Sequence, residues 1–441
     1  MKNNNSICSF RWSYPIYYMF DQSMGYCCRT PAQYISPENA DKYEAEVFTK
    51  MDYFQKRRLE MLEGIRHEDC ISCWKLEDNG IQSPRLYSNF EFQMQKSGIL
   101  EKNETLQNLA DNELKKEKVS ADASPDIVEI VLSNLCNAKC VYCNEFYSTS
   151  WLQEKKRTRS VSDTYFDKQR NSRLDQLFWK WFEDKAMKTV NRIGFIGGEP
   201  LLIPELYECL FQINEIANRL PQLKYKPEIC ITTNLSINDI YLNKFIDLAQ
   251  QMNKNFKFVI QVSLESVGKQ TEYIRFGTNW KLIESNIEKL LSLNNLDLEI
   301  AVLPTMNILA IPTIEQFLLE ISRLHKKFQK DIKILSNTVT DPSMLNPSIL
   351  SKNQSHYVIK AAEYMQSELQ SKMISDKQKE FFNEYLLYLN NLQKNLNSRD
   401  SVDIKQLELL HLFLQKNDLL RQTNFKNIFP EIASIIEMEL L

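Results

Sequence analysis

The sequence predicts an α/β fold, built as a partial (β/α)6 TIM-like barrel with a small N-terminal cysteine-rich domain and a helical C-terminal extension. Between residues 126 and 346, apolar runs of strand length alternate with longer amphipathic stretches, as in repeated βα units around a parallel sheet. All ten cysteines lie at or before Cys230. Beyond residue 347 the chain is rich in Leu, Asn, Gln and Lys, which predicts helices only.

Six apolar runs are the expected barrel strands, and they lie at residues 127–133, 191–197, 228–234, 258–264, 298–304 and 332–338. Between them, apolar side chains recur at helical spacing from Leu174 to Phe182, from Leu242 to Ala249 and from Phe317 to Phe328. These stripes predict helices that pack on the sheet. In such barrels the functional side chains lie at the C-terminal ends of the strands.

The N-terminal region, residues 1–95, carries five cysteines and many aromatic residues, with little long-range periodicity. A small irregular unit of this kind commonly depends on a bound metal to fold. Residues 101–125 are polar and charged, which predicts a solvated helix followed by a linker. We therefore expect domains at residues 1–95, 126–346 and 347–441, with a polar linker at 96–125.

Composition excludes several classes of protein. The 441 residues are 43% hydrophobic and 25% charged, the balance of a soluble globular chain. The net charge of −3 gives no overall basic field, so we expect no nucleic-acid partner. Arg11, Ser13 and Pro15 interrupt the apolar N-terminus, and no later window resembles a membrane span. We expect a cytoplasmic protein without membrane contact, in which cysteines serve metal or redox chemistry rather than disulfides.

Cys136, Cys140 and Cys143 form a CxxxCxxC motif directly after the first expected strand. Three thiolates on one short loop can hold three corners of a cubane iron–sulfur cluster and leave the fourth iron open for a small molecule. A structural zinc site would ordinarily need a fourth protein ligand, and no His or Cys follows at short range. A zinc loop or a coincidence is the alternative.

CxxxCxxC with Tyr142 before its last cysteine resembles the signature of radical S-adenosylmethionine (SAM) enzymes. The resemblance implies a 4Fe-4S cluster that binds SAM and cleaves it reductively to a 5′-deoxyadenosyl radical. Gly197, Gly198, Glu199 and Pro200, at the end of the second strand, resemble the family's GGEP motif, which contacts the amino group of the SAM methionine. Glycines allow close backbone approach, and the glutamate accepts a hydrogen bond from the ammonium.

Further segments resemble the third and fourth strands of the family, namely TTN (232–234), SLES (263–266) and YIRFGTNW (273–280). The resemblance places Ser263 and Glu265 near the SAM ribose and makes Arg275 a candidate for the SAM carboxylate. It also adds Tyr142 and Asn234 to the SAM-binding residues. The alternative is that Glu265 caps a helix and Arg275 forms a surface ion pair.

A second group of cysteines lies in the N-terminal region. Cys70 and Cys73 form a CxxC hairpin of the kind that holds metals, and Cys8 with Cys27 or Cys28 completes four thiolates. Four soft ligands suit zinc and an iron–sulfur cluster about equally.

The flanking sequence resembles the N-terminal auxiliary-cluster region of twitch or SPASM-like radical SAM proteins, which implies a second 4Fe-4S cluster. The chain keeps Glu77, Gly80, Ser83 and Arg85 in the family's register after the CxxC hairpin.

The chain also departs from that family pattern. Gly25 lies only two residues before Cys27, and Arg11-Trp12 stands where the family tends to have Pro-Trp. We favour Cys27 as the fourth ligand, with Cys28 as a buried thiol.

Two other stretches continue the resemblance over nearly the whole chain. Residues 144–154 resemble the family's serine-rich stretch ending in Trp and Glu, and residues 417–431 resemble its closing Asp, Arg and Pro-Glu segment. Cys209 and Cys230 are expected in the core. The histidines show no ligand spacing, and only His67, close to Cys70, is a minor candidate for the cluster.

The sequence therefore predicts a radical SAM enzyme with SAM and two 4Fe-4S clusters, which abstracts a hydrogen atom from its substrate. Relatives with an extra cluster domain often modify ribosomally made peptides (RiPP maturation), so we expect a peptide maturase that performs splicease-like tyramine excision, crosslinking or epimerisation. The implied partners are the peptide, a separate peptide-recognition protein and an electron donor such as a flavodoxin or ferredoxin. The alternatives are radical chemistry on a sugar or nucleoside and a noncatalytic metal-stapled scaffold.

Overall fold

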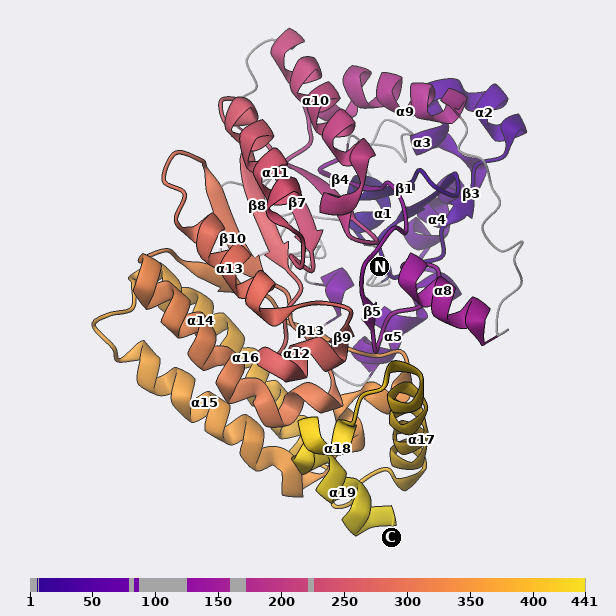
Figure 1. The fold of residues 1–441 in the computed structure, drawn as a ribbon. Coiled ribbons are helices and arrows are strands. Elements are labelled where there is room, and N and C mark those ends of the chain that lie inside the picture. Colours follow the sequence, from indigo (N-terminus) through magenta and orange to yellow (C-terminus); the bar gives the residue numbers. More distant parts are fainter. Residues whose placement is uncertain are drawn as a thin grey trace, which may run out of the picture. The chain divides into compact units, whose positions relative to one another are not determined.

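The computed structural model describes residue 6 and residues 8–78, 83–86, 125–158, 172–220 and 226–440. The expected polar linker, apart from Pro125, and Gly80 lie outside these residues. The described chain forms two compact units. Unit 1 is drawn from Met1–Ser133, Asp163–Ile196 and Glu208–Ile229, and unit 2 from Asn134–Ser162, Gly197–Tyr207 and Cys230–Leu441. Figure 1 shows the ribbon with most of their elements labelled.

Unit 1 contains a sheet in which the N-terminal region joins the first barrel strands. β4 (Ile127–Val131) pairs in parallel with β6 (Arg192–Ile196) and with β1 (Pro15–Tyr18). β1 continues antiparallel to β2 (Ser23–Tyr26), which pairs antiparallel with β3 (Gln33–Tyr34). All four side chains of β1 are buried, so the strand shows none of the alternation by which a half-exposed strand is recognised.

The described helices of unit 1 are α1 (Phe10–Ser13), α2 (Pro37–Tyr43), α3 (Val47–Lys50), α4 (Asp52–Leu62), α5 (Ile71–Asp78) and α9 (Ser172–Asp184). The apolar stripe of α9 faces the core as expected, with Phe178, Trp181 and Phe182 almost fully buried. Phe178 stacks on Tyr17 of β1 with ring centroids 4.9 Å apart. Burial of each such aromatic side chain contributes about 1.5–3 kcal/mol to stability.

Unit 2 contains the later barrel strands. β8 (Lys257–Val262) and β12 (Ile332–Ile334) each pair in parallel with β10 (Leu298–Val302), and β7 (Glu228–Thr233) neighbours β8. The last expected strand is shorter than predicted, because the chain leaves the sheet after Ile334. Residues 337 and 338 instead form β13 (Asn337–Thr338), which pairs with β11 (Thr305–Met306).

The described helices of unit 2 are α8 (Thr149–Arg157), α11 (Asp239–Met252), α12 (Gly268–Ile274), α13 (Trp280–Leu291), α14 (Ile314–Phe328), α15 (Ser355–Leu369), α16 (Asp376–Asn397), α17 (Ile404–Arg421), α18 (Phe425–Ile428) and α19 (Pro430–Leu440). α10 (Pro204–Arg219) has residues in both units. α14 packs on α15, and α15 on α16 (Figure 1). Each of the six expected strands is present and followed by helix, so the α/β class with a partial TIM-like barrel and a helical C-terminal region is confirmed.

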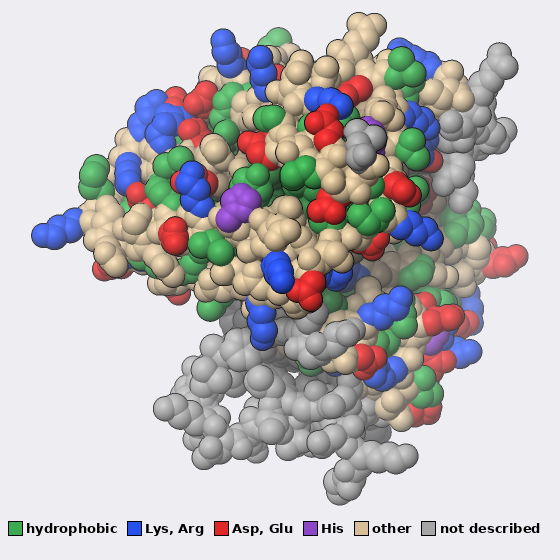
Figure 2. Space-filling view, turned by 90° about the horizontal axis from the view of Figure 1, so that it is seen from below, with side chains coloured by type: hydrophobic (Ala, Val, Ile, Leu, Met, Phe, Trp, Pro, Cys, Tyr) green, Lys and Arg blue, Asp and Glu red, His purple; other side chains and the backbone are tan. Residues whose placement is uncertain are grey.

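Cys209 and Cys230 lie in the core, as the sequence predicts. Cys209 is buried, and Cys230 packs with Val259 and Ala301. On the face shown in Figure 2, Lys and Arg side chains are interspersed with Asp and Glu side chains. Among the described helices, none is both long enough and apolar enough to span a bilayer.

Candidate active site

The three motif cysteines lie in unit 2 on the loop segment that leads to α8, within which Cys140 belongs to the short strand β5 (Lys139–Cys140). All three side chains are partly exposed. Burial of the sulfur and the neighbouring Cys140 thiol raise the pKa of Cys136, and the same two causes raise the pKa of Cys143 to about 12. These thiols therefore lie close enough to interact, and a bound group that supplies positive charge is needed to make them thiolates at neutral pH. This environment fits an iron–sulfur cluster.

Helix α8 holds the cysteine loop through side-chain hydrogen bonds. Ser148 caps the helix and donates its Oγ–H to the carbonyl of Ala138 at 2.7 Å. Ser150 donates to the carbonyl of Cys136 at 2.7 Å, and Trp151 Nε1 donates to the carbonyl of Cys140 at 2.9 Å. The serine-rich stretch that ends in Trp and Glu is therefore the support of the loop.

Two glycines lie directly against the backbone of the same loop. Gly198 has φ +57°, and a Cβ there would overlap the carbonyl oxygen of Leu135. Gly277 has φ +101°, and a Cβ would lie 2.5 Å from the carbonyl oxygen of Asn137. Both glycines thus allow close approach to the cysteine loop, a role that the sequence did not reveal.

We expect Gly198→Ala to displace the cysteine loop, because it adds both the strain of a left-handed backbone and a clash with Leu135. SAM cleavage should fall at least about tenfold, which corresponds to about 1.4 kcal/mol, and iron content should fall with it. The measurements are iron content and 5′-deoxyadenosine formation after anaerobic reconstitution.

Gly268→Ala is the matched control for this prediction. Gly268 has a similar φ of +61°, but the nearest atom to an added Cβ is Gln270 Oε1 at 3.7 Å. This variant therefore carries the backbone strain without the clash. Equal loss of iron in both variants would contradict the proposed role of Gly198.

Glu199 joins the GGEP segment to the end of β7. The carboxylate is fully buried, its Oε1 accepts hydrogen bonds from Thr233 Oγ1 at 2.6 Å and from the Leu201 amide at 3.2 Å, and its Oε2 accepts one from the Asn234 amide at 2.6 Å. Burial raises the pKa of Glu199 to about 7, although these hydrogen bonds oppose the shift. Glu199 caps the short turn that begins at Pro200.

Asn234 links β7 to the cysteine loop. Its Nδ2 donates to Asn137 Oδ1 at 2.8 Å, while Asn137 Nδ2 donates to the carbonyl of Ser236 at 2.8 Å. Ser263 follows β8, its amide donates to the carbonyl of Thr233 at 2.8 Å, and its side chain is partly exposed. The ends of β7 and β8 and the cysteine loop therefore meet.

Arg275 and Glu265 form an ion pair beside Cys140. Arg275 Nη2 lies 2.6 Å from Glu265 Oε2, and both side chains are at most 5% exposed. Tyr142 donates its hydroxyl to Glu265 Oε1 at 3.0 Å, and Arg275 Nη1 donates to Cys140 Sγ at 3.8 Å. The alternative of a surface pair is wrong, because the pair is buried. Burial raises the pKa of Cys140, and the Arg275 charge opposes that shift.

A second ion pair joins α17 to α8. Arg421 Nη2 lies 3.1 Å from Glu154 Oε1, whose Oε2 lies 2.5 Å from Lys139 Nζ. The Arg421 guanidinium also stacks over the rings of Trp151 and Phe276 at 4.8 and 5.2 Å. The sequence marked both segments as motifs, but only the structure shows that they bind each other.

A comparison with known families identifies the domain that contains this site. Residues 130–343 match the radical SAM superfamily. The chain contains a radical SAM domain. The domain implies SAM and one 4Fe-4S cluster as cofactors. All nine residues predicted for SAM and the three motif cysteines lie in unit 2 and within this match.

Curated relatives and solved structures are also similar to parts of this chain. GTP 3',8-cyclases from two strains of Clostridium perfringens are 27% identical over 177 residues, which are 40% of this chain and 45% of the relative. The match thus spans less than half the length of these relatives. Native anSMEcpe with bound AdoMet is 15% identical with a TM-score of 0.37, covering 55% of this chain and 61% of that chain. Streptococcus suis SuiB bound to S-adenosylmethionine is 11% identical with a TM-score of 0.37, covering 80% and 68%.

Besides the radical SAM domain, the second group of cysteines forms one pocket in unit 1. Cys8, Cys27, Cys70 and Cys73 are buried and line it together. The prediction that Cys28 is a buried thiol is wrong, since Cys28 is exposed. Cys27 has φ +83°, so the chain turns directly after β2 and the two neighbouring side chains differ in burial.

The residues after the CxxC hairpin support this pocket. Arg85 binds the Glu77 carboxylate through Nε at 2.9 Å and Nη2 at 2.5 Å, and Ser83 donates its hydroxyl to the same carboxylate. Arg85 also lines the pocket. His67 instead accepts a hydrogen bond from the Asp69 amide at 3.1 Å.

The thiols of this pocket resemble those of the radical SAM loop in their environment. Burial and the neighbouring Cys70 raise the pKa of Cys8 to about 11. In the described part of the chain, no group of three or more His, Cys, Asp or Glu side chains is arranged to hold a metal ion. The support for bound clusters therefore consists of cysteine spacing, shared burial and the charges around the sulfurs.

Proposed function

We propose that this radical SAM enzyme modifies a ribosomally made peptide and uses a second 4Fe-4S cluster in a twitch or SPASM-like N-terminal region. The observation that carries the proposal is the pocket of four buried cysteines in unit 1, in addition to the three motif cysteines. Cleavage of SAM requires only one cluster, so a second set of thiols indicates a further redox step.

When bound, SAM and its cluster supply a 5′-deoxyadenosyl radical that takes one hydrogen atom from the substrate. The substrate is left with one unpaired electron, so a closed-shell product requires the transfer of one further electron, either alone or together with a proton as a hydrogen atom. The four buried thiols would hold a group suited to that transfer. Excision of a tyramine unit, crosslinking and epimerisation all begin with this abstraction and differ in the fate of the unpaired electron.

The chain's own residues bind and orient SAM in this proposal. Glu199 Oε2 accepts one hydrogen bond, and a carboxylate oxygen offers about two acceptor sites, so a site remains for the SAM ammonium. Arg275 is held by Glu265 with its Nη1 at Cys140, where it would bind the SAM carboxylate. The partly exposed Ser263 would bind the ribose.

Glu199→Gln should weaken SAM binding while iron content stays at the wild-type value. The amide preserves the volume and one acceptor for the Asn234 amide, and the Thr233 hydroxyl can accept from the new NH₂ group. The variant loses a charge-assisted hydrogen bond of about 1.5–3 kcal/mol, which is roughly tenfold or more in affinity. Equilibrium binding of SAM to the reconstituted protein measures the effect.

The pH dependence separates a contact with SAM from a structural role of Glu199. An ammonium favours the ionised carboxylate, so SAM affinity should fall as the pH drops below about 7 in the wild type and stay level in Glu199→Gln. Glu129→Gln is the control, because burial raises the pKa of Glu129 to about 7 as well, but Glu129 lies in unit 1. Equal profiles for wild type and Glu199→Gln would show that GGEP is only a structural turn here.

The reaction itself tests the peptide proposal. Reconstituted enzyme is incubated with SAM, a reductant and a short peptide encoded beside its gene, and mass spectrometry records the peptide mass and 5′-deoxyadenosine. We expect a mass change in the peptide together with SAM cleavage. Deuterium at the abstracted position should appear in the 5′-deoxyadenosine.

A small-molecule substrate is the second candidate, and the similarity to GTP 3',8-cyclases favours it. The same assay with GTP and with other nucleoside triphosphates in place of the peptide distinguishes the two. Product formation from a nucleotide, with every neighbouring peptide unchanged, would replace the peptide proposal.

A further inference from the structure

Arg11 is one of the positions at which the N-terminal region departs from the auxiliary-cluster pattern that it resembles, since that pattern tends to have proline there. The side chain belongs to α1, is only 2% exposed and lines the pocket of the four cysteines. A guanidinium keeps its positive charge at every physiological pH, so this substitution brings a permanent charge to a buried thiol pocket.

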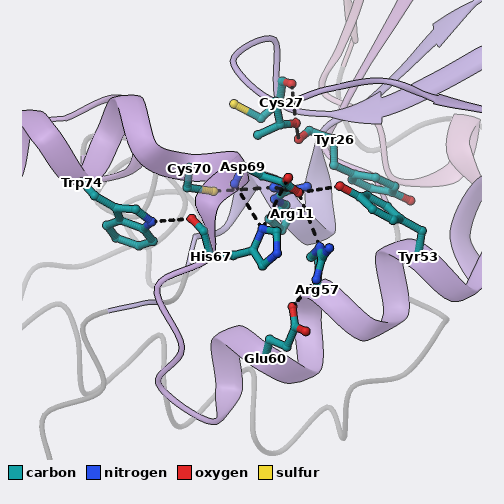
Figure 3. A network of polar contacts seen from close by, with 11 residues as sticks. Arg11, Tyr26, Cys27, Tyr53, Arg57, Glu60, His67, Asp69, Cys70 and Trp74 are labelled. Atoms are coloured by element: carbon teal, nitrogen blue, oxygen red, sulfur yellow. Dashed lines mark hydrogen bonds and ion pairs between the residues drawn. The ribbon is translucent and has the colours of Figure 1, made fainter.

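The contacts of Arg11 leave part of the guanidinium without partners. Nη2 lies 3.1 Å from Asp69 Oδ2 and 3.6 Å from Cys70 Sγ. Nε and Nη1 are buried and have no hydrogen-bond partner among the described residues. Figure 3 shows the guanidinium beside Cys70 and Asp69. A buried donor without a partner costs about 1–3 kcal/mol, and more when it is charged. The protein therefore holds Arg11 in a state that an anion in the pocket would stabilise.

Asp69 neutralises Arg11 only in part. Its carboxylate also accepts the hydroxyl of Tyr53 at 2.6 Å and lies 3.5 Å from Arg57 Nε (Figure 3). Arg57 has a second carboxylate of its own, that of Glu60 at 2.6 Å. Of these two arginines, Arg11 alone both lines the pocket and contacts a cysteine sulfur.

We propose that Arg11 donates its Nε–H and Nη1–H groups to the anionic iron–sulfur group held by Cys8, Cys27, Cys70 and Cys73, and thereby raises the reduction potential of that group. The inference rests on the proposed second cluster. Four thiolates give such a cluster a net negative charge, and reduction adds one more negative charge. A fixed cation with free donors at the sulfurs stabilises the reduced form most, and hydrogen bonds to the sulfurs are an established determinant of cluster potential.

The test uses the full chain with Cys136, Cys140 and Cys143 replaced by Ala, so that the measured absorption comes from the N-terminal cluster alone. In this background we compare Arg11→Met and Arg11→Lys by potentiometric titration of the cluster's visible absorption. Arg11→Met should bind the same iron but be at least tenfold less reduced at a given potential, a shift of at least 59 mV for one electron. Arg11→Lys, which keeps the charge but loses the guanidinium donors, should shift less.

Arg57→Met is the matched control, since it removes an equal charge from the same Asp69 without lining the pocket. Its potential should move less than that of Arg11→Met. Full iron with an unchanged potential in Arg11→Met would overturn the inference and leave the second cluster intact. Zinc in place of iron in the parent background would overturn the second cluster, and the inference with it.

A second measurement covers the case in which Arg11→Met fails to hold iron. Pulsed EPR of the reduced cluster in the parent background, grown with ¹⁵N-labelled arginine, should detect coupling to an arginine nitrogen. Arg11→Lys should lose that coupling, and Arg57→Met should keep it. No coupling in the parent background would overturn the inference.

Discussion

Replacing Cys136, Cys140 and Cys143 by Ala should abolish reductive SAM cleavage and remove about half of the iron that the reconstituted protein binds. Wild-type protein should bind about eight iron atoms if both cysteine sets hold cubane clusters, and the triple variant about four. The expected loss of activity is complete, because the remaining buried residues, such as Glu199 and Arg275, which we propose to bind and orient SAM, cannot deliver an electron to it. Iron analysis and chromatography of 5′-deoxyadenosine measure both effects.

Cys230→Ala is the control for this variant. Cys230 is a buried thiol of the same unit that packs with Val259 and Ala301 in the sheet. Its loss should leave iron content and SAM cleavage at the wild-type value and affect only stability. Stoichiometric zinc in wild-type protein, with no visible absorption that dithionite bleaches, would contradict the cluster assignment and favour the zinc alternative.

The barrel could be predicted from the sequence because its strands are buried on both faces. Such strands are continuous apolar runs, and the runs at 127–133 and 258–264 became β4 and β8 with ends displaced by at most two residues. The last run was only partly right. The apolar sequence continues past Ile334, but β13 pairs with β11 through a tertiary contact that local hydrophobicity does not predict.

The N-terminal region was harder to predict for the same physical reason. β1 has only four residues, all buried, so it shows no alternation, and besides the neighbouring β2 it pairs with β4 more than a hundred positions later. The burial of Cys27 and the exposure of Cys28 depend on a positive φ at Cys27. A positive φ is uncommon for cysteine and cannot be predicted from its presence in the sequence.

Contiguous motifs revealed the site, whereas its supports are long-range. CxxxCxxC and GGEP are each readable in one stretch. Glu154 and Arg421, in contrast, are 267 positions apart, and the fit of Gly198 against Leu135 depends on backbone approach rather than on any side-chain pattern. Sequence reasoning therefore finds the residues proposed to bind the cofactor before it finds those that hold the loop in place.

The double variant Cys70→Ala with Cys73→Ala should uncouple SAM cleavage from product formation. Both thiols line the unit 1 pocket, and Cys70 also packs with Cys8, Trp12 and Trp74 in an apolar cluster. Without a metal the pocket would lose the proposed bonds that join Cys73 of α5 to Cys8, which lies just before α1, so hydrogen exchange should increase in both helices. β1 should stay protected, because its pairing with β4 and β2 does not involve the thiols.

In the same variant, formation of 5′-deoxyadenosine should survive because the motif cysteines are untouched, whereas formation of the modified product should be lost if the second cluster completes the electron transfer. Cys28→Ala is the control, since it removes a cysteine from the same region whose side chain is exposed, and it should leave iron content and product formation unchanged. Assays of 5′-deoxyadenosine and of modified product on the same sample give the ratio of product formed to SAM cleaved, which measures the uncoupling. Normal product formation by the double variant would mean that the second cluster is dispensable, and the redox role given to the four thiols would then be wrong.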